Sequence, residues 1–270
     1  MQIHVLASGS TGNATFIKMG GANILVDAGI SARRIKQSLA AIGTAVEDLD
    51  GVLITHEHRD HVCGLKTLSR RYHLPIYTRP ATWNAMDSCE VPPECQLELG
   101  ESLDLGEVKI EPFSISHDAA DPVGFRFYQG RSKCALATDL GFVTDSVKKA
   151  LALSDALVLE ANHDVDMVKQ GSYPWFLKQR ILSNRGHLAN TDTGWTLARL
   201  ARKSHCHVFL AHLSQENNHP DLAENTVASI LTEQGCRLGT DLTLHITHPD
   251  RAAGMEDNQE GYRDEPASSL

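Results

Sequence analysis

The sequence predicts an α/β fold in which two β-sheets pack face to face and helices cover their outer sides. The chain contains two strand-rich stretches, and helical segments follow each of them, which is the order of elements expected of such layered folds. A length of 270 residues suits one domain of the larger kind, and 41% hydrophobic with 22% charged residues is ordinary for a globular protein.

The first strand-rich stretch occupies the N-terminal part of the chain. Short apolar runs alternate there with polar, glycine-bearing turns, and they predict strands at 3–7, 14–18, 22–29 and 51–55. Ser31 is a good N-cap for an amphipathic helix that ends at Gly43. Two further helices are expected after the fourth strand, at 61–72 and 81–88.

The second strand-rich stretch begins near residue 102. The same kind of apolar run returns and predicts strands at 102–116, 124–130, 133–139, 155–162, 207–212 and 243–247. Helical patterns separate or follow these strands at 191–203 and 220–235. We therefore expect one domain over residues 1–249. Residues 250–270 are acidic and poor in apolar side chains, so we expect them to form a disordered tail.

The cysteines and the N-terminus indicate a cytoplasmic location. The six cysteines contain no C-x-x-C pair and are typical of scattered, reduced thiols. The opening MQIHVLASGS does not resemble a signal peptide, and no apolar run reaches the roughly 18 residues of a membrane helix. We expect no membrane partner, and the sequence does not indicate an oligomeric state.

The formal net charge of −9 argues at face value against a nucleic-acid partner. However, six acidic residues face only two arginines between Asp250 and the C-terminus, so much of this charge lies in the tail. Two bound divalent cations would offset most of the remainder at the place that matters. The net charge therefore does not exclude nucleic acid as a substrate.

A segment rich in metal ligands, THEHRDH at 55–61, begins where the strand at 51–55 ends. On a helix His56 and His58 would point about 200° apart, whereas on a loop they can converge on one ion. Asp60 and His61 can face a different direction where the next helix begins. One short segment can thus offer two ligands to each of two neighbouring metals, which predicts a dinuclear site.

The remaining ligands are expected at the ends of other strands, because functional groups sit on loops that a rigid scaffold positions. In three places an apolar run delivers a ligand-type residue at its end. These residues are His117, Asp139 and His212. Any one of them alone would be an ordinary structural or surface residue, but three at the same relative position favour a shared site.

These motifs resemble the metallo-β-lactamase superfamily. THEHRDH, SISHD, LATDLG and LAHLS match its ligand motifs, and the resemblance extends from about residue 2 to residue 248. It implies a four-layer αββα sandwich with two divalent metal ions per chain, Zn²⁺ or Mn²⁺. By that pattern one ion is held by His56, His58 and His117, the other by Asp60, His61 and His212, and Asp139 bridges both.

Within this superfamily the sequence most resembles the YycJ/VicX-like nucleases. The matching segments include VLASGSTGNATFI, ILVDAGIS, LVLEANHDVDMV, PWFLKQRILSNRGHLAN and LAHLSQENN. Asp139, in place of a cysteine, disfavours β-lactam hydrolysis, and His58, in place of a glutamate, disfavours di-iron redox chemistry. The resemblance implies a 5′-to-3′ DNA exonuclease. Our hypothesis for its mechanism is that a hydroxide shared by the two metals, and oriented by Asp60 and Asp139, attacks the phosphorus.

Two segments are expected to contact the substrate phosphates. The loop SGSTGN contains Ser8, Ser10 and Asn13, and its backbone can approach a phosphate closely, although a plain tight turn would have the same composition. Lys178 and Arg180 lie among aromatic side chains, a mixture that suits backbone phosphates and stacked bases. An anchor for a surface helix is an equal alternative for those aromatics.

Three further residues have predicted roles around the metals. By resemblance to tRNase Z enzymes, His187 becomes a phosphate contact and a general acid. His163 follows another strand and is a candidate substrate contact, with contact to a metal as an alternative. Asp27, also at a strand end, can hydrogen-bond a ligand histidine and so orient it.

Two other functions stay open at this point. One is a small-molecule phosphodiesterase of the same fold, which would depend little on the basic residues between 169 and 185. The other is a non-enzymatic regulatory binding protein that uses the metals structurally. The complete ligand set disfavours the second, because a structural role does not require an open dinuclear centre.

Overall fold

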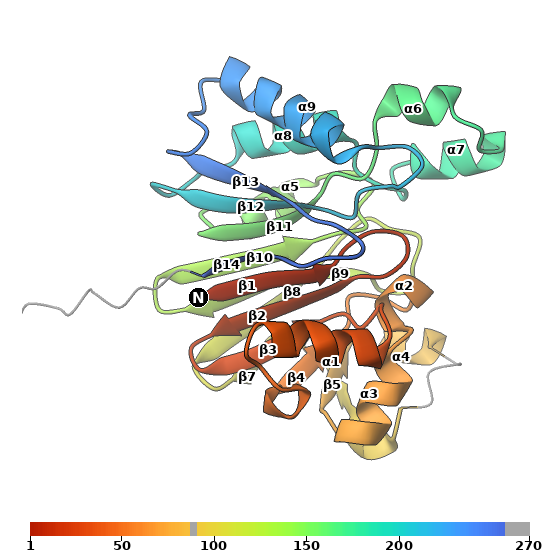
Figure 1. Ribbon diagram of the computed structural model, residues 1–270, viewed down its shortest axis with the longest axis vertical. Helices are drawn as coiled ribbons and strands as arrows, with labels where there is room; N and C mark the ends of the chain where they lie inside the picture. Colours follow the sequence, from red (N-terminus) through yellow and green to blue (C-terminus); the bar gives the residue numbers. More distant parts are fainter. Residues whose placement is uncertain (87–90, 257–270) are drawn as a thin grey trace, which may run out of the picture.

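Two seven-stranded sheets pack face to face in the computed structural model, and helices cover their outer sides (Figure 1). The structure describes residues 1–86 and 91–256. The predicted αββα sandwich is therefore confirmed.

The first sheet contains most of the N-terminal strands. Its order across the sheet is β14 (Ala253–Glu256), β1 (Gln2–Ala7), β2 (Ala14–Met19), β3 (Ala22–Val26), β4 (Gly51–Leu53), β5 (Ile76–Thr78) and β6 (Gln96–Glu98). The second sheet has the order β13 (Leu242–Ile246), β12 (Cys206–Ala211), β11 (Ala156–Glu160), β10 (Ser132–Ala137), β9 (Val123–Gln129), β8 (Val108–Ser114) and β7 (Leu103–Leu105).

The helices lie in two outer layers. Those outside the first sheet are α1 (Ala32–Ala41), α2 (Arg59–Val62), α3 (Leu65–Tyr72) and α4 (Pro80–Ala85), with short 3₁₀ turns η1 (Val46–Asp48) and η2 (Pro93–Cys95). Those after β10 are α5 (Asp145–Leu151), α6 (Val165–Gln170), α7 (Trp175–Ile181), α8 (Asn190–Arg199) and α9 (Pro220–Glu233). In Figure 1, α6 and α7 project together from one corner of this second layer.

The apolar core forms three clusters that match the layers. One lies between the sheets and includes Ile3, Phe125 and Phe209. A second lies between the first sheet and its helices, and a third between the second sheet and its helices. Central strands such as β11 are buried along their whole length because both of their faces are covered.

Parallel pairing places the site residues at one edge of the sandwich. β10, β11, β12 and β13 run parallel, as do β3 and β4. The carboxyl ends of parallel strands lie at the same edge, and loops at that edge carry function. Asp27, His56, Asp139 and His212 all come just after such strands, so the topology gathers them.

The structure differs from the sequence-based expectations at several places. The strand expected at 102–116 is an antiparallel pair, β7 and β8. The helix expected at 61–72 is two helices, α2 and α3, because Gly64 packs against the chain before α1: a Cβ there would lie 2.2 Å from the Ile30 carbonyl oxygen. Residues 253–256, expected in a disordered tail, form β14 and pair with β1. Residues 257–270 of that tail lie outside the described residues.

Among the described residues no helix combines the length and the apolarity that crossing a membrane requires.

Candidate metal centre

The loop that leaves β4 is held to the end of β3 by one carboxylate. Asp27 accepts hydrogen bonds from the backbone N–H and the hydroxyl of Thr55, at 2.9 Å and 3.0 to 3.1 Å. Its Oδ2 also lies 2.8 Å from Nδ1 of His61. The predicted contact between Asp27 and a ligand-type histidine is therefore present in the structure.

Four histidines are anchored through Nδ1, and this sets the direction of their rings. His56 Nδ1 lies 3.0 Å from the Thr55 hydroxyl, and His117 Nδ1 lies 3.1 Å from the Gly186 carbonyl oxygen. His61 and His212 are held in the same way by Asp27 and Glu160, each at 2.8 Å. An outer partner on one ring nitrogen leaves the other nitrogen for a metal, as in most histidine metal sites.

The seven predicted ligands come together at one place. Four groups have ligand atoms within 4.8 Å of one another: His56 with His58 and His117, Asp60 with His61 and His212, His56 with His61 and Asp139, and Asp139 with Glu160, His187 and His212. Asp139 lies between the first two groups, since its carboxylate oxygens are 3.1 Å from His61 Nε2, 3.8 Å from His117 Nε2 and 3.3 Å from His212 Nδ1. The arrangement matches two adjacent sites that share one carboxylate.

Buried atoms without partners show that cations fit this centre. Among the described residues His56 Nε2, His212 Nε2 and Asp139 Oδ2 are buried and have no hydrogen-bond partner. Leaving such groups unsatisfied costs about 1–3 kcal/mol each. These three atoms belong to the groups just described, and nitrogen and carboxylate donors together suit zinc or manganese.

Three of the positions have a backbone conformation that is unusual for residues other than glycine. φ is +61° at Asp27, +60° at Asp139 and +57° at His212. A left-handed residue immediately after a strand turns the chain sharply and re-aims its side chain. Such strain persists where the surrounding structure enforces it, and it is concentrated at functional sites.

Carboxylates and histidines shift one another's pKa in opposite directions. Burial alone would raise the pKa of Asp60 and of Asp139, but His212 and His61 outweigh it and hold both values well below the usual range. Burial opposes the charged form of His61, yet Asp27 and Asp139 raise its pKa well above the ordinary value. The site therefore attracts positive charge, and metal binding there would displace protons.

Glu160, at the end of β11, supports both the centre and the neighbouring pocket wall. Its Oε1 lies 2.8 Å from Nδ1 of His212 and 2.9 Å from Nδ1 of His187. Its Oε2 accepts the backbone N–H groups of Leu140 and Leu188 at 2.8 and 3.1 Å. The side chain is fully buried, so these bonds hold it in one orientation.

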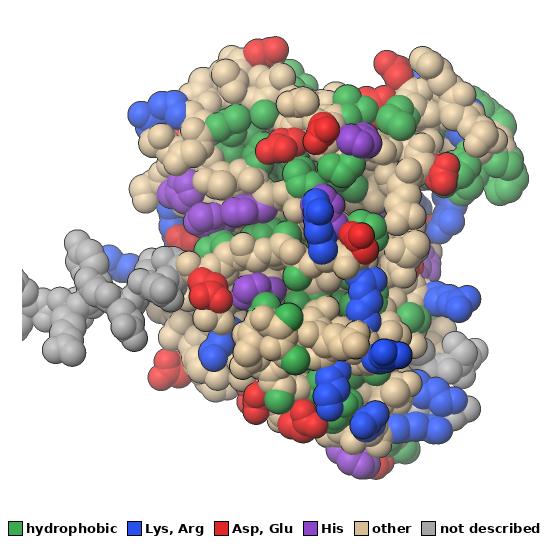
Figure 2. Space-filling view, in the orientation of Figure 1, with side chains coloured by type: hydrophobic (Ala, Val, Ile, Leu, Met, Phe, Trp, Pro, Cys, Tyr) green, Lys and Arg blue, Asp and Glu red, His purple; other side chains and the backbone are tan. Residues whose placement is uncertain are grey.

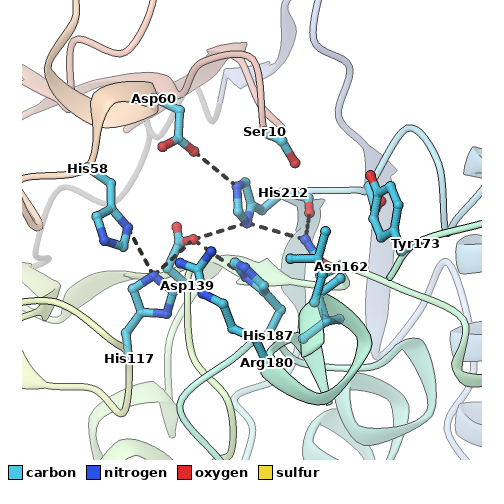
Figure 3. A pocket seen from close by; sticks show the side chains of 13 residues that line it. Ser10, His58, Asp60, His117, Asp139, Asn162, Tyr173, Arg180, His187 and His212 are labelled. Carbon is cyan, nitrogen blue, oxygen red and sulfur yellow. Dashed lines mark hydrogen bonds and ion pairs between the residues drawn. The ribbon is translucent and has the colours of Figure 1, made fainter. Parts of the chain in front are cut away.

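An open cavity of about 230 Å³ lies over the centre (Figure 3). It is lined by ligand-type residues, by Ser10 and His187, and by side chains of the α6–α7 region: Tyr173, Leu177, Arg180 and Ile181. Figure 3 shows Arg180 and His187 beside Asp139, with Asp60 and Ser10 across the pocket. Arg180 is oriented by Asp118, whose Oδ2 lies 2.6 Å from its Nε.

The loop SGSTGN contributes to the centre differently from the expectation. Ser10 lines the cavity as predicted, whereas Ser8 and Asn13 are buried and hold ligand-bearing segments. The Ser8 hydroxyl accepts the His212 backbone N–H at 2.7 Å. The Asn13 backbone N–H donates to the Asp60 carbonyl at 2.8 Å, and its side chain lies 3.4 Å from the Asp60 carboxylate.

Two other predicted contacts do not reach the cavity. His163 is 2% exposed and belongs to none of the ligand groups; burial, the largest influence on its pKa, lowers that pKa to about 4. Lys178 is half-buried on α7, and its ammonium group donates to the Lys169 carbonyl. His163 follows a strand just as the ligands do, so its position in the sequence alone could not separate it from them.

Several residues of the site were not assigned a role from the sequence. Asn162 and Ser214 line the cavity, and the Asn162 side chain donates to the His212 carbonyl at 2.7 Å. That Glu160 contacts both His187 and His212 could not be read from the sequence either. In the sequence, Asn162 and Ser214 are distinguished only by their positions just after β11 and β12. Many residues without a functional role have such positions.

Comparison with known proteins supports the fold and the family. A model of the beta-lactamase superfamily domain matches residues 22–212. The chain is 39% identical over 253 residues to "Exodeoxyribonuclease YycJ" of Bacillus anthracis, covering 92% of this chain and 96% of that protein. It is 38% identical over 257 residues to "Exodeoxyribonuclease WalJ" of Streptococcus pneumoniae, covering 93% and 96%. Among solved structures, the metallo-β-lactamase fold protein YhfI of Bacillus subtilis superimposes with a TM-score of 0.70 at 17% identity, over 94% of this chain and 99% of that one.

Proposed function

The chain belongs to the beta-lactamase superfamily, among its YycJ-like nucleases, as a metal-dependent hydrolase of phosphodiester bonds, and we propose that it is a DNA exonuclease that degrades its substrate from the 5′ end. The observation that carries this proposal is the convergence of seven ligand-type residues under a cavity that Arg180 and His187 also line. An arginine and a histidine beside a cationic centre are suited to a phosphodiester.

We propose the ligand sets that the sequence implied. His56, His58 and His117 would hold one divalent ion, Asp60, His61 and His212 the other, and Asp139 both. Two such ions would supply Lewis acidity and, from water, a hydroxide nucleophile near neutral pH. The histidine-rich first set suits zinc, and the carboxylates of the second set also admit manganese.

The protein's own groups then position the phosphate and move the proton. Arg180, held by Asp118, presents a guanidinium to the cavity and can donate to a phosphate oxygen. His187 has Nδ1 bound to Glu160, so its Nε2 can face the ester oxygen of the leaving nucleotide. The Glu160 carboxylate holds the imidazole in one orientation, and a protonated His187 can thereby donate to the leaving oxygen as the general acid.

The wall of the cavity supports nucleic acid rather than a small ester. α7 has no buried residue, and Trp175 and Phe176 on it are 68% and 72% exposed, while Leu177 and Ile181 face the cavity. Exposed aromatic rings beside a phosphate-binding pocket can stack nucleobases. A small phosphodiester would fill the cavity without reaching these rings.

A cytoplasmic location is part of the same proposal, since all five cysteines described are free thiols.

The test is the degradation of DNA labelled at the 5′ or the 3′ end, with manganese or zinc added and an Asp60→Ala protein beside the wild type. We expect stepwise release from the 5′ end that the variant lacks. Release from the 3′ end would contradict the proposed polarity. Intact DNA together with variant-sensitive hydrolysis of bis(p-nitrophenyl) phosphate would replace the nuclease with a small-molecule phosphodiesterase.

A further inference from the structure

The helices outside the first sheet carry a charge opposite to that of the whole chain. α1, α2 and α3 contain seven of the 25 lysines and arginines but, in Asp60, only one of the 34 acidic residues. We call these residues the basic layer: Arg33, Arg34, Lys36, Arg59, Lys66, Arg70 and Arg71. Figure 2 shows lysine and arginine side chains gathered over these helices.

Four side chains of the basic layer are exposed and have no acidic partner among the described residues. Arg33, Lys36, Arg59 and Arg71 are exposed, and none of them forms an ion pair with another of the described residues. Several cations elsewhere on the surface are paired, as in Arg126 with Glu111, Lys203 with Asp155 and Arg237 with Asp241, although isolated ones such as Lys18 are not. A concentration of unpaired like charges is unfavourable in the free protein, and a polyanion would relieve it.

Contacts between the helices join this layer into one surface. The Tyr72 ring lies under two of its cations: Lys36 Nζ is 5.9 Å and Arg71 Cζ is 5.5 Å from the ring centroid. The start of α1 packs against Gly64, between α2 and α3, where a Cβ would lie 3.3 Å from the Ala32 nitrogen. The cations of α1 and α3 therefore form one continuous patch.

The patch reaches the metal centre at one end. Arg59 stands between His58 and Asp60, which both line the cavity. At the other end of α1 the charge reverses, because Glu47 and Asp48 lie in η1. A polyanion that leaves the cavity past Arg59 would thus meet cations on α1 and α3 and be repelled beyond α1.

We propose that the basic layer binds the sugar-phosphate backbone of the DNA strand that extends beyond the metal centre. This inference rests on the proposed nuclease function and deepens it. Contacts from lysine and arginine to phosphates hold a strand in register without reading its sequence. The layer therefore lets the enzyme retain a long substrate of any sequence between successive cleavages, although the chain as a whole is acidic.

The test compares two triple variants with the same change in net charge. One removes the proposed contacts, Arg33→Gln with Lys36→Gln and Arg71→Gln. The control, Lys18→Gln with Arg131→Gln and Lys149→Gln, removes three exposed cations outside the layer. Affinity for a labelled single strand of about 30 nucleotides is measured between about 50 and 200 mM salt, in an Asp60→Ala background that blocks turnover. Hydrolysis of bis(p-nitrophenyl) phosphate is measured in proteins that keep Asp60.

We expect the layer variant to bind DNA at least about tenfold more weakly than the wild type at low salt. The magnitude of its slope of log affinity against log salt should decrease by about 2, whereas the control should have the affinity and the slope of the wild type. Both should hydrolyse the small ester like the wild type. If the triple variant misfolds and loses that hydrolysis, DNA binding is measured with the single variants Lys36→Gln and Arg71→Gln instead. A decrease of about 0.7 in the slope of log affinity against log salt for each variant supports the proposal, and an unchanged slope overturns it.

Equal binding by the layer variant and the control, with wild-type protein still degrading end-labelled DNA, would overturn this inference and leave the nuclease function intact. A wild-type protein that neither binds nor degrades DNA would overturn both.

Discussion

The carboxylate of Glu160 orients the imidazole of His187, with 2.9 Å between Oε1 and Nδ1. The same oxygen lies 2.8 Å from Nδ1 of His212. One buried side chain thus sets the tautomer of a proposed metal ligand and of the proposed general acid. The metal centre and the proton donor are coupled through it, which leads to the first prediction.

Glu160→Gln should impair metal binding and catalysis together. Oε2 receives two backbone N–H groups, so the glutamine carbonyl would take that side and the amide would face His187 and His212. The Nδ1 atoms of both histidines would then have to accept a hydrogen bond, so the ring protons would move to Nε2. His212 needs a lone pair on Nε2 to bind a metal. We expect metal affinity to fall about 10- to 100-fold, measured by metal titration, together with kcat. Glu111→Gln on the surface is the control, and unchanged metal affinity would contradict the argument.

His187→Ala should separate the proton donor from the metals. We expect kcat on DNA to fall about 10²- to 10⁴-fold while the bound metal content stays that of the wild type. Hydrolysis of bis(p-nitrophenyl) phosphate should fall much less, since p-nitrophenolate leaves readily without a proton. An equal loss on both substrates would show that His187 does not act as a general acid.

Gly29→Ala should destabilise the metal-binding loop. A Cβ at Gly29 would lie 1.7 Å from the Asp60 carbonyl oxygen and 2.6 Å from the Asn13 nitrogen, so the backbone that carries Asp60 would have to move. We expect a loss of about 3 kcal/mol or more in the free energy of unfolding, measured with denaturant. Gly100→Ala is the matched control, because nothing lies within 4 Å of its Cβ and its φ is not positive. Equal stability of the two variants would refute this account.

Lys133 should make stability depend on alkaline pH. Burial first, and then the like charges of Arg126 and Lys203, lower its pKa from 10.5 to about 8. Between these two values the unfolded chain holds a proton that the folded protein has lost, so stability rises with pH. Relative to the Lys133→Met variant, the free energy of unfolding of the wild type should increase by on the order of 1–2 kcal/mol between about pH 7 and about pH 10. Denaturant unfolding of both proteins at each pH measures this difference. Lys149→Met is the exposed control, and a constant difference would show that Lys133 titrates normally.

The sequence by itself determined the family, the layered fold and the group of residues around which the site is built. THEHRDH is contiguous, and His117, Asp139 and His212 each end an apolar run, so a local pattern was enough to identify them. Parallel strands then bring their carboxyl ends to one edge, which explains why residues far apart in the chain were expected to meet.

Only the tertiary structure decided which of the remaining candidates reach the cavity. Ser8 and His163 follow strands just as Ser10 and Asp139 do, yet they do not line the cavity. Which residues Glu160 contacts, and that the cations of α1 and α3 meet around Tyr72, depend on how the layers pack. Local composition specifies strands, turns and ligand types, because these depend on neighbours in sequence. Distances between segments follow from packing across the whole domain, and no short stretch of sequence contains them.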